Sequence, residues 1–397
     1  MATGAFTPTF QIYKGGENIT AGFHNRALSI KVELQSGNGG QDTCTIIADD
    51  RDWALAAPHV GDVIEVSLGY EEVGLALMGS FELDEVTFIG PPRVIQIHGN
   101  SMGFSSAAKA PQVKNFEGKT VKDLVEWAAQ QLGVQAVVDQ DIGSKQVPYR
   151  NNTVSPMHLL GQLEREFGAV FKIGQGRLSF AGRDSGITAS GQEIPLVVLR
   201  PEHLGSWEVR HLNRSDYSSV SARYRDRDSN KEETVQSKSK VGGVLGQGEG
   251  GSNRDYPIGT LFPSKEQAQS AADSTMKRLD ANLGEGLFTL AQGDPWVRDQ
   301  NRILVIGTRD GIDGSYVSDI VAHSYSKDSG LTTSIRTQAP GDGSDFAPLY
   351  EAAPDAALAP APGQVVGNVL PKQGDPANSN PAAPPPSTAP DPRITAQ

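Results

Sequence analysis

The chain has 397 residues, with 35 basic and 47 acidic side chains and a formal net charge of −12. The hydrophobic fraction of 37% and the single cysteine favour a globular protein without a disulfide framework or a thiolate metal cluster. No run approaches the roughly 20 apolar residues that span a bilayer, and residues 1–10 lack a signal-peptide pattern. We therefore expect folding in a reducing cytoplasm. An acidic chain also repels phosphate, which disfavours sequence-specific DNA binding.

The first hundred residues show the two-residue alternation of β-strands. Apolar side chains alternate with polar ones over Leu28–Leu34 and again over Ile64–Leu68. The alternation changes phase between Phe81–Leu83 and Val86–Phe88, which predicts a β-bulge. Several short strands separated by turn signals predict a barrel or sandwich, and we assign residues 1–105 to a first β-barrel domain.

The hydrophobic period then changes to that of helices. Thr120 can cap a helix that Gly133 ends, and Ser155-Pro156 can begin a second helix that Gly168 ends. Two short strand patterns follow the second helix. Residues 106–204 are therefore predicted to form a small α/β domain inserted between two β domains.

Strand patterns return after about residue 205. A polar, glycine-rich stretch over residues 228–260 predicts a long mobile loop. Ser264 then opens a helix that is expected to run to about Leu279. We interpret residues 205–339 as a second β-barrel domain carrying one helix. Its further strands are predicted over residues 287–291, 303–306, 316–325 and 331–336.

The last segment, residues 340–397, differs in composition from the rest. It holds 13 of the 25 prolines, together with 6 acidic and 2 basic residues. Such a segment buries too little apolar surface to offset its ordering entropy, so a disordered tail is predicted. The complete fold prediction is thus mainly β, with two β-barrel domains flanking an α/β insertion, followed by this tail.

The sequence offers little catalytic chemistry. None of the seven histidines forms an i, i+4 pair for zinc, and Cys44 lies in a strand pattern that predicts a buried structural thiol. Glu164 and Glu166 lie two residues apart and point to different faces of their helix, so they do not read as a catalytic pair. We assign no catalytic, cofactor-binding or metal-binding residue, and no cofactor. The seven histidines are His24, His59, His98, His158, His203, His211 and His323.

Two apparent ligand motifs have simpler interpretations. Gly246, Gly248 and Gly251 satisfy G-x-G-x-x-G, but no strand precedes and no helix follows, so a loop is favoured. Asp310, Asp313 and Asp319 depart from calcium-loop spacing. A turn at Asp313-Gly314 is the better interpretation, because glycine readily takes a positive φ.

Two groups of motifs resemble the phage late-control protein D family, whose members are baseplate hub subunits. The first group consists of residues 115–124, 155–163 and 167–171, and the second begins at residues 262–268. The resemblance covers roughly residues 10–338 and leaves the tail outside. The remaining pieces of the second group are Gly293-Asp294-Pro295, Asp313-Gly314 with Tyr316, His323, and residues 328–333. These named positions read as fold determinants, because most are turn formers.

The resemblance implies a homotrimer in which each chain supplies two tube-like barrels, adapting a six-fold tail tube to a three-fold spike. The implied partners are the tail tube protein and the spike protein, with the tape measure protein and other baseplate proteins as further candidates. DNA would be cargo in the lumen, and the location would be the virion tail baseplate after synthesis in the host bacterial cytoplasm. Three alternatives stay open: a type VI secretion spike hub, a late-transcription regulator and a cell-wall hydrolase.

Overall fold

The computed structural model describes residues 6–36, 41–53, 55–56, 58–101, 110–174, 176–183, 194–211, 217–225, 231–238, 254–281 and 284–338. The predicted tail, and the G-x-G-x-x-G segment at Gly246, lie outside the described residues. Among those described, no helix is long and apolar enough to cross a membrane.

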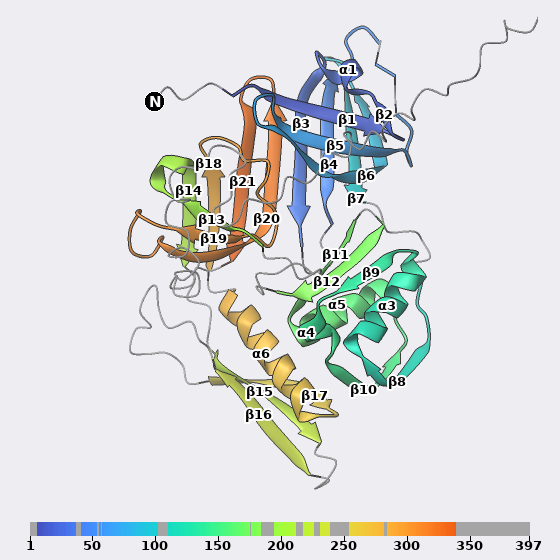
Figure 1. Ribbon diagram of the computed structural model, residues 1–397, viewed down its shortest axis with the longest axis vertical. Coiled ribbons are helices and arrows are strands. Elements are labelled where there is room, and N and C mark those ends of the chain that lie inside the picture. Colours follow the sequence, from blue (N-terminus) through green and yellow to red (C-terminus); the bar gives the residue numbers. More distant parts are fainter. Residues whose placement is uncertain are drawn as a thin grey trace, which may run out of the picture. The chain divides into compact units, whose positions relative to one another are not determined.

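The largest element is a sheet of 13 strands, visible in blue and orange in Figure 1. Its main path runs β14-β18-β21-β20-β3-β4-β7-β6-β5-β1-β2, and β13 and β19 join beside β20. The strands are β1 (Pro8–Lys14), β2 (Glu17–Asn18), β3 (Ala27–Gln35), β4 (Thr43–Asp49), β5 (Val63–Tyr70), β6 (Gly74–Ile89), β7 (Val94–Ser101), β13 (Leu196–Leu199), β14 (Leu204–His211), β18 (Gly284–Leu290), β19 (Arg302–Val305), β20 (Gly314–Ser326) and β21 (Gly330–Gln338).

Two halves of this sheet have the same order of strand pairing, which we call the repeated wiring. In the first half β3 pairs with β4, β4 with β7, β7 with β6, and β6 with β5. In the second half β14 pairs with β18, β18 with β21, β21 with β20, and β20 with β19. Antiparallel pairing of β3 with β20 joins the halves, with Ser324 opposite Lys31. Each half has its own apolar core, the first around Phe81 and the second around Phe288.

This pairing corrects the expectation of two barrel domains. The described strands form several sheets, none of them a closed barrel, and the two β regions share one open sheet. The two-residue alternation correctly indicated which face of each strand is buried. It carries no information about which strand edges meet, because an edge pairs through backbone groups that every sequence has.

The face of the sheet turned away from the two cores is largely polar, with a few exposed apolar side chains such as Leu287 and Ile89. One row across it, in register, consists of Thr332, Ser324, Lys31, Thr45, His98 and Glu85. All six of these side chains are partly or fully exposed. We call this side the polar sheet face.

An α/β region follows β7 in the chain. Its first helix begins at Thr120, whose hydroxyl and Asp123 form a reciprocal cap, and ends at Gly133 with φ of 71°. Its last helix begins after Ser155 and ends at Gly168, as predicted. Its elements are β8 (Lys114–Thr120), α3 (Val121–Leu132), β9 (Gln135–Val138), α4 (Gln140–Gly143), β10 (Gln146–Asn152), α5 (Pro156–Phe167), β11 (Ala169–Gly174) and β12 (Arg177–Gly182).

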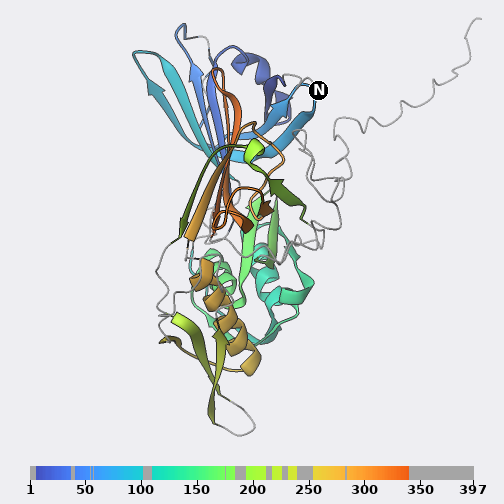
Figure 2. The same ribbon diagram turned by 90° about the vertical axis from the view of Figure 1, so that its left-hand side faces the viewer.

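A third region combines three strands and one helix. β15 (Tyr217–Arg225) lies between β16 (Glu232–Lys238) and β17 (Arg254–Phe262), and α6 (Lys265–Ala281) covers one face of this sheet (Figure 2). β16 and the first part of β17 fall within residues 228–260, so the prediction of one continuous loop there is wrong. Both strands are mostly exposed, so their sequences lack the apolar alternation that marks a half-buried strand.

The remaining short elements lie beside the large sheet. They are α1 (Thr20–Phe23) and the 3₁₀ helix η1 (Pro201–His203). The predicted domain boundaries at residues 105, 204 and 339 stay predictions.

Candidate functional site: the motif loop and its charge cluster

The motif residues near the end of the chain meet around one buried histidine. His323 on β20 is fully buried, with Nδ1 3.0 Å from the Thr333 hydroxyl and Nε2 3.0 Å from the Val297 carbonyl oxygen. Burial, together with the nearby Arg298 cation, lowers the pKa of His323 to about 3. The imidazole is therefore neutral near pH 7. Since a carbonyl only accepts, Nε2 carries the hydrogen and Nδ1 accepts from Thr333.

Gly293-Asp294-Pro295 opens the loop that passes over this histidine, and we call residues 293–301 the motif loop. A Cβ on Gly293 would lie 2.5 Å from the Leu331 carbonyl oxygen, so no larger residue fits without movement. The Asp294 backbone N–H donates to the Thr333 hydroxyl at 3.0 Å, and the Asp294 carboxylate accepts from the Trp296 N–H at 2.9 Å. The motif thus fixes a turn against β21.

The motif loop also binds the first half of the sheet. The Tyr70 hydroxyl on β5 donates to the Gly293 carbonyl at 2.7 Å, and burial raises the pKa of Tyr70 to about 12. The Arg298 guanidinium donates to the Leu77 carbonyl on β6 at 3.1 Å. Burial lowers the pKa of Arg298 from its usual value. The loop therefore holds both halves by hydrogen bonds in addition to the β3–β20 pairing.

A charge cluster lies at the end of the motif loop. Lys172 on β11 places Nζ 2.8 Å from Asp299 and 3.0 Å from Asp42, and the Ser36 hydroxyl also bonds Asp299. Burial opposes the charge of Lys172, but the two carboxylates outweigh it and raise the Lys172 pKa. Burial and the neighbouring Asp299 raise the pKa of Asp42. The cluster connects the α/β region to both halves of the sheet.

The second motif forms a separate turn. Asp313 accepts backbone N–H groups from Gly307 at 3.0 Å and Thr308 at 2.8 Å, while Gly314 begins β20 opposite Val305. Tyr316 donates its hydroxyl to the Ile312 carbonyl at 2.6 Å, and its ring meets Phe288 edge to face. Tyr316 and His323 lie seven residues apart on β20, roughly 23 Å along a strand. The structure therefore does not bring the two motifs together.

Sequence reasoning missed the charge cluster. Lys172, Asp42 and Asp299 come from three distant parts of the chain, and none stands in a recognisable pattern. A strand pattern that placed a lysine or an aspartate on a buried face would have indicated the charge cluster, because these residues are rarely buried unless they are paired. The alternation around β11 places Lys172 on the less buried side, so it gave no such signal.

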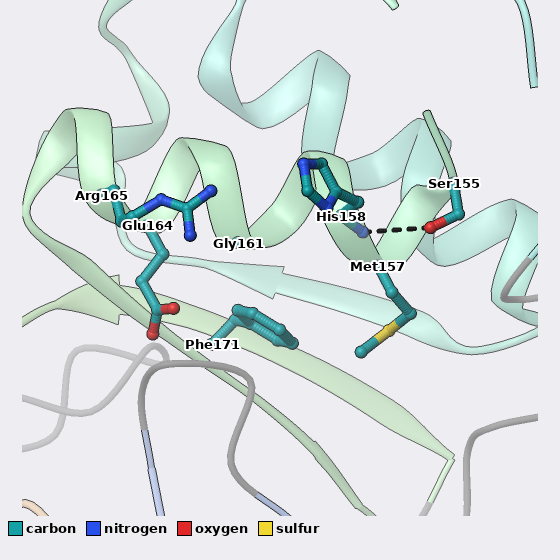
Figure 3. A pocket seen from close by; sticks show the side chains of 7 residues that line it. All are labelled: Ser155, Met157, His158, Gly161, Glu164, Arg165 and Phe171. Atoms are coloured by element: carbon teal, nitrogen blue, oxygen red, sulfur yellow. Dashed lines mark hydrogen bonds between the residues drawn. The ribbon is translucent and has the colours of Figure 1, made fainter. Parts of the chain in front are cut away.

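A cavity of about 330 Å³ lies beside α5, and Figure 3 shows its lining. Glu164 is buried, but its carboxylate points past Phe171 and away from His158. Glu166 instead pairs with Arg150 at 2.6 Å. The two carboxylates thus lie in different surroundings, unlike the facing pair that glycoside hydrolysis uses. The described residues hold no cluster of three or more His, Cys, Asp and Glu side chains that could bind a metal.

The fold is that of phage-type tail proteins. A tail protein from Neisseria meningitidis MC58 superposes with a TM-score of 0.61, at 12% identity, over 84% of this chain and 97% of that protein. The 43 kDa tail protein of prophage MuSo2 from Shewanella oneidensis gives a TM-score of 0.58, at 14% identity, over 83% of this chain and 98% of that protein. No protein-family model matches the chain.

Sequence comparison identifies more specific relatives. The probable baseplate hub protein of Escherichia phage 186 is 23% identical over 365 residues, covering 84% of this chain and 93% of that protein. The corresponding protein of Escherichia phage P2 is 22% identical over 366 residues, covering 85% and 94%. The expected resemblance to phage baseplate hub proteins is confirmed, and these relatives indicate a component of the virion tail. These relatives provide no evidence for a catalytic activity.

Proposed function

We propose that the chain is a trimeric baseplate hub subunit that joins a tail tube to a spike. Similarity to probable baseplate hub proteins over more than four-fifths of the chain supports the hub assignment. The proposal includes trimer formation and the start of tube assembly. It also includes contacts with the tube, spike, tape measure and other baseplate proteins. The motif residues from Gly293 to His323 are proposed to determine the fold rather than to contact a partner.

The repeated wiring of the sheet is the observation that carries this proposal. The first set of five strands, β3 to β7, and the second set, β14 with β18 to β21, pair in the same order. The pairing of β3 with β20 joins the two sets. One chain therefore presents two similar sheet halves, and three chains present six. A three-fold particle built this way offers six similar units to a six-fold tube while keeping three-fold symmetry for a spike.

The polar sheet face suits the wall of a passage for DNA. Across the central strands it presents Lys31 against Glu33 and Glu85, with hydroxyl and amide groups between them. A wall with few cations does not hold phosphate strongly, so a polyanion can pass. The formal net charge of −12 agrees with this role.

Native mass spectrometry of the 42.2 kDa chain, alone and co-expressed with tube and spike proteins from the same source, tests the proposal. The expected product contains three hub chains with three spike chains, and electron microscopy should show a ring with six similar units. A monomer in isolation is compatible with trimer formation during assembly. A stable dimer, or a complex with six hub chains, would overturn the proposal.

A further inference from the structure

In the part of the chain that the structure describes, the run of eight strands from β14 to β6 ends in two unpaired edges, that of β14 and that of the second part of β6. β5 pairs with Gly74–Glu82 of β6, whereas Glu85–Ile89 of the same strand pairs only with β7 among the described residues. At the other end, β14 pairs with β18 and with no other described strand. Each edge leaves a row of backbone donors and acceptors that a strand from another chain could use.

Both free edges carry exposed aromatic side chains. Phe88 is 61% exposed and Trp207 is 44% exposed, and both lie on the core side of the sheet. Natural edge strands are commonly protected by lysine, proline or a covering segment. Neither Leu204–His211 nor Glu85–Ile89 contains lysine or proline, and their charged residues, Glu85, Glu208 and Arg210, all project from the polar sheet face, which leaves the core side of both edges without such protection. These edges therefore have the character of strands that become covered.

The chain already contains one junction of the required kind. The first part of β20 pairs with β19, and after a bulge at Asp319 its second part pairs with β3. The first part of β6 pairs with β5, and a bulge at Asp84 precedes its second part, which pairs with β7 on one edge and with no described strand on the other. By the repeated wiring, β6 is the counterpart of β20, and β14 is the counterpart of β3.

Strand direction also permits this junction between copies. Neighbouring strands from β14 to β6 are all antiparallel, and their number is eight, so the two end strands run in opposite directions. Copies related by rotation about an axis along the strands would therefore bring β6 and β14 together antiparallel. The polar sheet face would continue from one copy to the next.

We propose that Glu85–Ile89 of β6 pairs antiparallel with β14 of a second copy, repeating the β20–β3 junction between chains. The proposal rests on the multi-copy hub described above and names the surface that closes it. It is a heterologous contact, which closes into a ring when each copy uses both of its edges.

The register follows from the internal junction. One in-register row runs Ile320, Arg336, Leu287, Glu208, and its counterpart in the first half runs Glu85, His98, Thr45, Lys31. Glu208 thus corresponds to Lys31, and Ile89 corresponds to Ser324. Since Ser324 lies opposite Lys31 within the chain, Ile89 lies opposite Glu208 between chains.

The neighbouring pairs in this register are complementary. Thr87 lies opposite Arg210, which pairs with Glu208 and Glu285 of its own chain. Arg210 is also diagonal to Glu85 of the other copy, which would add a third carboxylate within its reach on the polar sheet face. On the core side, Phe88 lies opposite Val209 and diagonal to Trp207. The two exposed aromatic side chains would therefore cover each other and join the cores of adjacent copies.

Cysteine cross-linking tests the junction in the hub co-expressed with its tube and spike proteins. Thr87→Cys with Arg210→Cys in one chain should give disulfide-linked dimers and trimers under mild oxidation. Thr87→Cys with Val209→Cys is the matched control, because Val209 projects from the opposite face and should give no such ladder. The native Cys44 is buried and does not compete.

A second measurement does not depend on disulfide geometry. Phe88→Glu should weaken association of copies by about tenfold or more, because a charge replaces an apolar anchor. Val113→Glu, at another exposed apolar position, is the control and should leave association unchanged. Circular dichroism of each variant verifies that the monomer is folded.

The outcomes separate this junction from the hub proposal itself. Trimers that form normally but give no Thr87–Arg210 cross-link, and tolerate Phe88→Glu, would overturn the junction and leave the hub standing. A cross-link of Thr87 to Glu208 in place of Arg210 would overturn the register. A chain that stays monomeric with both partner proteins present would overturn both proposals.

Discussion

Tyr70 donates its hydroxyl hydrogen to the carbonyl oxygen of Gly293 at 2.7 Å, joining positions 223 residues apart. Tyr70 ends β5 in the first half of the sheet, and Gly293 opens the motif loop of the second half. The bond is buried, so water does not replace it when either partner is lost. The stability of the sheet therefore depends on this contact between its halves.

Tyr70→Phe should destabilise the protein by about 1–2 kcal/mol, because it leaves a buried carbonyl without its donor. Urea denaturation followed by circular dichroism measures the change. Tyr149→Phe removes the same atom from an exposed tyrosine and is the control. Equal stabilities for the two variants would show that the Tyr70 hydroxyl contributes nothing.

Gly293→Ala should destabilise by roughly 2–4 kcal/mol, because the new Cβ would lie 2.5 Å from the Leu331 carbonyl oxygen. The same substitution at Gly161 should instead raise the stability of the protein. Gly161 lies inside α5 with open space around its Cβ position, and alanine favours helix by up to about 1 kcal/mol. Thermal denaturation of the two variants should thus move in opposite directions.

The neutral His323 predicts a pH dependence. Its folded pKa of about 3 lies below the usual 6.5, so between these values the unfolded chain binds more protons than the native one. Stability should fall as pH falls from 6.5 towards 3, by up to about 1.4 kcal/mol per pH unit from this group. Urea denaturation at a series of pH values measures the slope.

His323→Gln should reduce that slope by about one proton, because glutamine does not titrate. His59→Gln removes an exposed histidine and is the control. A slope in the His323 variant equal to that of the parent chain would contradict the buried neutral imidazole.

Lys172→Met should destabilise by about 3 kcal/mol, because Asp42 and Asp299 are left close together without their cation. Adding Asp42→Asn and Asp299→Asn to this variant should recover much of the loss. Lys122→Met breaks an exposed pair with Glu126 and should cost less than about 0.5 kcal/mol. Chemical denaturation of the four proteins decides whether charge balance is the cause.

Cys44 should resist thiol reagents in the folded protein. It is 1% exposed, and burial raises the pKa of its thiol to about 12, so thiolate is scarce at neutral pH. Ellman's reagent should react only on addition of denaturant, in step with unfolding. Rapid reaction under native conditions would show that β4 opens locally.

Features that depend on neighbouring residues were predictable from the sequence. Thr120 and Ser155 cap helices and Gly168 ends one, because a cap requires only hydrogen bonds within a few residues. The phase change near Asp84 correctly indicated a bulge, because alternation records which face each side chain occupies.

Features that depend on distant pairing were not predictable. The β3–β20 pairing unites strands about 290 residues apart, and backbone edges leave no mark in side-chain pattern. Within the candidate site, the resemblance pointed to His323 and Gly293, but Lys172, Asp42 and Asp299 carried no local signal. Their significance arises only where the folded chain brings them together.

The β3–β20 pairing also sets the order in which the protein can be completed during synthesis. β3 ends at residue 35, but its partner strand ends at residue 326, so β3 must wait while most of the chain is translated. At roughly 5–20 residues per second, this interval is about 15–60 seconds. During that time β3 can pair with β4, but its other edge lacks β20, and nascent chains on one messenger RNA could pair through these uncovered edges. Ribosome-bound chaperones would therefore have their largest effect on this protein before its last strands emerge.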